Sequence, residues 1–146
     1  RFSPPVFHGP GPKLGYVVQV CVQEESKFLH TSDVQGPLSK EQTSFLFQEN
    51  PQVIFCDGPL TYMLGRRYSM ESLHQATQKL SEIVEKTQVK KLVLDHHLLR
   101  ELKWKEKLEG VFSAAKLREV EVLTAAEFAG MQNDLLEARR RKLYGR

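Results

Sequence analysis

The segment Lys91-Leu92-Val93-Leu94-Asp95-His96-His97 decides the fold class, because it is a short apolar run that ends abruptly in acidic and imidazole side chains. Two earlier segments repeat this pattern: residues 27–32 run into Asp33, and residues 53–56 run into Asp57. Short apolar runs bounded by turn-forming residues are typical of buried strands. We therefore predict three strands that each deliver polar side chains to the same edge of a sheet, where sites in open α/β sheets form.

Helix signals lie between these strands. Ser39 with Gln42, and Thr124 with Glu127, match the capping box, and Ser69 precedes a run with helical apolar spacing. Residues 1–14 are rich in proline and glycine and are expected to form a loop. We expect strands at residues 15–23, 27–32, 52–56, 91–94 and 119–123. We expect helices over 40–49, 99–107, 111–117, 125–130 and 133–143, and the longest helix after Ser69, with apolar positions at Leu73, Ala76, Leu80, Ile83 and Val84. This order, an antiparallel pair followed by alternating strands and helices, predicts a layered α/β arrangement.

Composition limits the class of protein. The chain has 146 residues, 40% hydrophobic and 27% charged, which is typical of one globular domain and unlike a disordered, collagenous or disulfide-scaffold protein. No run approaches the ~18 apolar residues of a transmembrane helix, so no membrane span is expected. Cys21 and Cys56 lie inside apolar runs, which favours a reducing cytoplasm and disfavours a zinc finger or a thiolate nucleophile. The chain opens at Arg1 without methionine, which suggests a fragment or a processed piece.

The net charge is only +3, but positive residues gather at the C-terminus: Arg139, Arg140, Arg141, Lys142 and Arg146. A solvated helix end explains such a cluster, because cations favour the negative pole of the helix dipole. The alternative is a tail that contacts the phosphates of a nucleic acid. We favour the solvated helix end.

Imidazoles and carboxylates are the candidate site residues. His8 lies in the loop that enters the first predicted strand, and it could join Asp33, His96 and His97 at the sheet edge. Such groups suit a metal ion or acid–base chemistry. We interpret Asp57 as a turn-former or helix cap rather than as part of the site.

Five blocks of sequence identify a family resemblance. They are Phe2-Ser3-Pro4-Pro5 with His8-Gly9 and Lys13-Leu14-Gly15-Tyr16-Val17, Ser32-Asp33-Val34-Gln35-Gly36-Pro37, Gly58-Pro59-Leu60-Thr61-Tyr62, Asp95-His96-His97-Leu98-Leu99-Arg100, and Val122-Leu123-Thr124-Ala125-Ala126-Glu127-Phe128. In this order they resemble the C-terminal half of an uncharacterised, mainly archaeal family of metallo-β-lactamase-fold hydrolases. The resemblance covers essentially the whole chain.

The resemblance implies a fold, a metal centre and a reaction. The fold is α+β, a four-layer αββα sandwich of which residues 1–146 would supply the C-terminal half. The ligands would be His8, Asp33 and His96, with His97 as the alternative to His96, for one or two ions. Zinc is the expected metal, with iron or manganese as alternatives. The reaction would be hydrolysis by a metal-activated hydroxide, with Asp33, His96 and Tyr62 as the catalytic residues.

One departure from the family pattern limits these implications. The first motif of the superfamily, H-x-H-x-D-H, does not occur in this sequence. We therefore expect an incomplete site and a partner, either the missing N-terminal half (from the same gene or a separate chain) or other copies in an oligomer. Two alternative functions remain: a nuclease or other nucleic-acid-processing protein of the same fold, and a non-catalytic half-domain that pairs with another chain. The substrate is not indicated.

Overall fold

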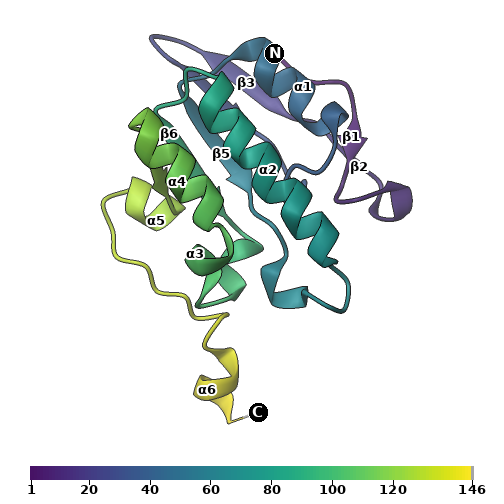
Figure 1. The fold of residues 1–146 in the computed structure, drawn as a ribbon, viewed down its shortest axis with the longest axis vertical. Coiled ribbons are helices and arrows are strands. Elements are labelled where there is room, and N and C mark those ends of the chain that lie inside the picture. Colours follow the sequence, from purple (N-terminus) through teal and green to yellow (C-terminus); the bar gives the residue numbers. More distant parts are fainter. Residues whose placement is uncertain (146) are drawn as a thin grey trace.

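The computed structural model describes residues 1–145, which form a five-stranded sheet with three helices on one face (Figure 1). The strands are β1 (Val6–Phe7), β2 (Tyr16–Val17), β3 (Val20–Gln23), β4 (Lys27–His30), β5 (Val53–Asp57), β6 (Lys91–Asp95) and β7 (Glu121–Leu123). The helices are α1 (Lys40–Glu49), α2 (Met70–Lys86), α3 (Trp104–Lys107), α4 (Glu109–Arg118), α5 (Ala125–Phe128) and α6 (Arg140–Tyr144). Three short 3₁₀ turns complete the set: η1 (Pro12–Leu14), η2 (Thr61–Met63) and η3 (Leu98–Arg100).

The sheet has the order β3-β4-β5-β6-β7. The β3–β4 pair is antiparallel, and the other three pairs are parallel. The prediction of an α+β fold is confirmed, and the strands predicted at 27–32, 52–56, 91–94 and 119–123 correspond to β4, β5, β6 and β7. Within residues 1–145, no helix combines the length and the apolar composition that crossing a membrane requires.

The hydrophobic core lies between the sheet and helices α1, α2 and α4 (Figure 1). Leu29, Ile54, Leu92 and Leu94 of the central strands are fully buried. The buried residues of α2 are those that the helical spacing predicted: Leu73, Ala76, Leu80, Ile83 and Val84. The two predicted capping boxes and the Ser69 cap are also confirmed.

The opposite face of the sheet is only partly covered. Successive side chains of a strand point to opposite faces, so Phe28 and Phe55 lie on the face away from α1 and α2. Helix α5 covers one end of this face, where the Phe128 ring packs edge-on against Phe55 with centroids 5.0 Å apart. Toward β3 the face is open, and Val22 there is 47% exposed.

The N-terminal segment differs from the prediction. The expected strand over residues 15–23 is divided into β2 and β3, because Gln19 is buried and its side chain donates to the carbonyl oxygen of Gln42 in α1. β2 pairs with β1, inside the segment expected to be a loop, to form a separate two-stranded sheet.

The C-terminal segment also differs. The helix expected over residues 133–143 is reduced to α6. Asn133 is held by the cap of α5: it accepts from the Thr124 hydroxyl at 2.6 Å and donates to Glu127 at 2.8 Å. These contacts hold the chain along α5 instead of letting it begin a helix. Arg146 of the predicted basic tail lies outside the described residues.

Candidate metal centre

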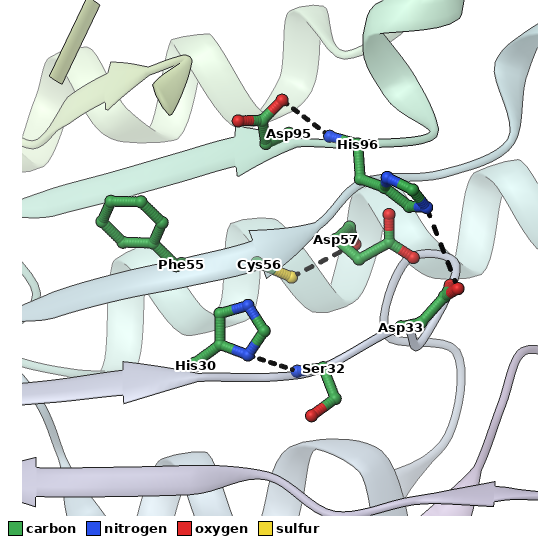
Figure 2. A pocket seen from close by; sticks show the side chains of 8 residues that line it. All are labelled: His30, Ser32, Asp33, Phe55, Cys56, Asp57, Asp95 and His96. Carbon is green, nitrogen blue, oxygen red and sulfur yellow. Dashed lines mark hydrogen bonds and ion pairs between the residues drawn. The ribbon is translucent and has the colours of Figure 1, made fainter. Parts of the chain in front are cut away.

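The polar residues at the carboxyl ends of β4, β5 and β6 lie at one edge of the sheet (Figure 2). Because these strands are parallel, their carboxyl ends lie together, and Asp57 is the register partner of Asp95. Backbone strain gathers at the same edge: Ser32, Gln35 and His96 have φ angles of 59°, 57° and 60°, in the left-handed region that non-glycine residues rarely adopt. Such outliers are frequent at functional sites.

Asp33 is the centre of the cluster. Its Oδ2 lies 3.1 Å from His8 Nε2 and 3.9 Å from His96 Nε2, and its Oδ1 lies 3.3 Å from His97 Nδ1. Asp33, His96 and His97 each offer a ligand atom, and all three atoms lie within 4.8 Å of one another. The structure therefore brings together all four residues that were expected to bind metal.

One oxygen of this carboxylate has no donor. Asp33 Oδ1 is buried and receives no hydrogen bond from residues 1–145, since the hydrogen bonds of the nearby His97 ring go to Asp57. A buried polar atom is normally paired, with protein, water or an ion. The chain thus leaves an unpaired acceptor 3.3 Å from the His97 ring, on a carboxylate whose other oxygen faces His8 and His96.

Asp57 holds the loops around this cluster in place. Its buried carboxylate accepts from the backbone N–H of Gln35 at 2.7 Å and of His97 at 3.3 Å, and its two oxygens each lie 3.1 Å from His97 Nδ1. Burial raises the pKa of Asp57, and the hydrogen bond with His97 opposes that rise. The interpretation of Asp57 as the cap of the next helix is wrong, because η2 begins at Thr61 without a side-chain cap and the Asp57 carboxylate instead accepts from Gln35 and His97.

Gln35 is a second residue that the sequence did not single out as a site residue. Its side-chain Nε2 lies 3.2 Å from His8 Nε2 and so orients that ring. Gly9 allows this approach: at its φ of 82°, a Cβ would lie 2.5 Å from Gln35 Oε1. The strand-end aspartates were a usable signal for Asp57, but no pattern in the sequence points to Gln35.

A cavity of about 410 Å³ opens beside the cluster, lined by His30, Ser32, Asp33, Phe55, Cys56, Asp57, Asp95 and His96 (Figure 2). Asp95 accepts the backbone N–H of His96 at 2.7 Å, and His30 Nδ1 accepts that of Ser32 at 3.1 Å. Burial raises the pKa of Cys56 to about 12, so its thiol stays protonated and is no nucleophile.

Tyr62, the remaining expected catalytic residue, lies elsewhere. It lines a neighbouring cavity, where its hydroxyl accepts from Arg100 Nη1 at 3.0 Å. The guanidinium carbon of Arg100 lies 5.4 Å from the centre of the Tyr62 ring. Tyr62 therefore positions an arginine, and within residues 1–145 no hydrogen bond joins it to Asp33 or to the three imidazoles.

Archaeal proteins of the UPF0282 family match this chain almost from end to end. The chain is 45% identical over 145 residues to a UPF0282 protein of Korarchaeum cryptofilum, a match that covers 99% of this chain and 48% of the relative. It is 42% identical over 143 residues to one of Metallosphaera sedula and 39% identical over 144 residues to one of Saccharolobus solfataricus, each match covering 46% of the relative. The chain thus spans about half the length of the curated relatives it matches. No protein-family model and no solved structure matches it.

Proposed function

We propose that this chain carries the metal-binding edge of a metal-dependent hydrolase. The observation that supports the proposal is the convergence of three imidazoles on Asp33, one of whose oxygens is buried without a donor. A purely structural ion-pair cluster would be expected to satisfy both oxygens, because an unpaired buried acceptor costs about 1–3 kcal/mol.

The donor set fits a transition metal. A carboxylate with imidazoles suits zinc, and also iron or manganese, and catalytic zinc sites typically have three protein ligands and one open position. We assign Asp33, His96 and His8 as the ligands. His97, whose Nδ1 is engaged by Asp57, would support the site by packing edge-on against the His96 ring, with ring centroids 4.2 Å apart.

The protein groups have separate tasks in this scheme. When bound, the ion would supply a nucleophile at neutral pH by lowering the pKa of a coordinated water. Asp57 fixes the His97 ring, and Asp95 holds the backbone of His96 through its N–H group. The adjoining cavity would receive the reacting group of the substrate.

A partner segment completes the proposal. We propose that the remaining half of the longer protein covers the open face of the sheet, forms the second half of a four-layer αββα sandwich and supplies ligands for a second ion. Two observations support this: the relatives are about twice as long as this chain, and apolar side chains such as Val22 and Phe28 lie on a sheet face that α5 covers at one end only.

Metal content tests the proposal on the protein expressed with whatever sequence flanks residues 1–146 in its gene. Elemental analysis is expected to find a stoichiometric transition metal, lost in Asp33→Asn and His96→Ala. His97→Ala should retain the metal with an affinity about 10- to 100-fold weaker, as for other supporting residues. His74→Ala is the matched control, since His74 is exposed on α2. A metal-free native protein, or a His96→Ala variant loaded like the control, would contradict the proposal.

A further inference from the structure

A cationic groove adjoins the candidate metal centre on the side of the C-terminal segment. Two neighbouring cavities of about 610 and 640 Å³ share Arg100, Glu137 and Arg140 in their walls. The second cavity reaches His96, which also lines the cavity beside Asp33. The cations of the groove are Arg100, Lys103, Arg140 and Arg141. His96 therefore joins the groove to the candidate metal centre.

Arg100 is oriented before any ligand arrives. Its Nη1 donates to the Tyr62 hydroxyl, and its guanidinium lies against the Tyr62 ring. This contact uses one of the five N–H donors of an arginine. Since Arg100 pairs with no carboxylate of residues 1–145, its other donors are left for an anion.

The charge of the groove is positive despite three carboxylates in its wall, Glu101, Asp134 and Glu137. Asp134 pairs with Arg139. Glu137 lies 3.2 Å from Arg140 and neutralises it, while Glu101 faces Lys107 with its Oε1 3.6 Å from the ammonium group. Arg141 is exposed and has no carboxylate partner among the first 145 residues. Its charge adds to that of Arg100, and an anion with more than one negative charge matches this pair best.

We propose that the cationic groove binds a phosphate group of the substrate, so that the substrate is a phosphate ester. This proposal rests on the hydrolase function proposed above and names its substrate class. The guanidinium fork matches two phosphate oxygens at once, which a single ammonium cannot do. The groove leads to His96, so a phosphate held by Arg100 places the substrate beside the centre. The ester is either a nucleic-acid strand or a small molecule, and both present the same group to Arg100.

Anion binding by the chelator-treated full-length protein tests the groove without any contribution from metal. One probe is a short single-stranded RNA labelled with fluorescein and followed by fluorescence anisotropy. The other is inorganic phosphate, followed by calorimetry, with acetate as the carboxylate control. We expect Arg100→Gln and Arg141→Gln each to weaken the binding of phosphate groups about tenfold, as for the loss of hydrogen bonds to a charged group. Arg118→Gln on the exposed end of α4 makes the same charge change and should have no effect.

The two probes distinguish the two kinds of ester. A nucleic-acid substrate is indicated if RNA binds far more tightly than phosphate. The slope of log affinity against log salt concentration should then become shallower by about 0.7 for each arginine removed. Equal affinity for the two probes identifies a small ester. Acetate that competes as well as phosphate, or variants that bind like the Arg118→Gln control, would overturn the proposal. Metal content measured on the same variants separates the two proposals: Arg100→Gln should keep its metal, and a metal-free protein that binds phosphate would refute only the hydrolase function.

Discussion

Asp57 holds the candidate metal centre together without being one of its assigned ligands, and the variant Asp57→Asn tests this role. The native carboxylate accepts two backbone N–H groups, from Gln35 and His97, and the His97 ring lies against both oxygens. Asparagine has nearly the same shape but only one accepting oxygen. One of the two loops must therefore lose its contact.

The size of the effect follows from the distances. The amide oxygen is expected to stay opposite the Gln35 N–H, where the native contact is shortest at 2.7 Å. The amide NH₂ then faces the N–H of His97, which becomes a buried donor without an acceptor. Such a group costs about 1–3 kcal/mol, and we expect the free energy of unfolding to fall by that amount. With His97 released, metal affinity should fall about 10- to 100-fold.

Urea-induced unfolding of the chelator-treated protein, followed by circular dichroism, measures the first effect, and metal titration of the folded variant measures the second. Asp95→Asn is the control, because Asp95 occupies the register position beside Asp57 but accepts only one N–H, which an amide oxygen can still accept. We expect it to change stability by less than about 0.5 kcal/mol. If Asp57→Asn and Asp95→Asn were equally stable and bound metal equally well, the supporting role of Asp57 would be refuted.

Two further variants test the frame around the site. The hydrogen bond from Arg1 holds the pKa of Glu49 below its usual value. The ionised Glu49 therefore stabilises the folded state fully above its unfolded pKa of about 4.3, and this stabilisation is lost as pH falls through the folded pKa. Urea midpoints should therefore fall more steeply below about pH 4 in the native protein than in Glu49→Gln; parallel curves would contradict this. A Cβ on Gly58 would lie 2.6 Å from Leu98 Cβ, so Gly58→Ala should displace η3 and lower stability by about 1–3 kcal/mol. Gly11→Ala, whose Cβ would meet nothing within 4 Å, is the control, and equal stability of the two variants would exclude the clash.

The parts of the fold that were predictable are those whose signals are local. Ser39 and Thr124 open helices through capping boxes that involve only the next three residues. The errors arise where one distant side chain overrides a local pattern. Gln19 interrupts an apolar run because its side chain donates a hydrogen bond to the carbonyl oxygen of Gln42, 23 positions away. Asn133 is hydrogen-bonded to α5, so residues 133–139 do not form the first part of the helix expected over 133–143.

The candidate site shows the same division. Aspartates that close parallel strands must meet at one sheet edge, so the approach of Asp33 to His96 was predictable from the order of elements. Which side chain supports which ligand depends on atoms that face each other only in the folded chain. No sequence pattern therefore distinguishes Asp57 from Asp95 as the carboxylate that supports the ligands. Nor does any pattern show that Tyr62 lies apart from the ligands and pairs with Arg100.

The position of the cavity connects the two halves of the proposal. His30 and Phe55 line the cavity beside Asp33, and both belong to the sheet face that α1, α2 and α4 do not cover. A layer that buried this face would therefore also form a wall of the cavity. Three ligands from residues 1–145 suffice for one ion, whereas a second ion needs side chains from outside them. The open sheet face and the candidate metal centre thus lie at the same edge, and under the proposal one partner segment would both cover this face and supply the ligands of a second ion.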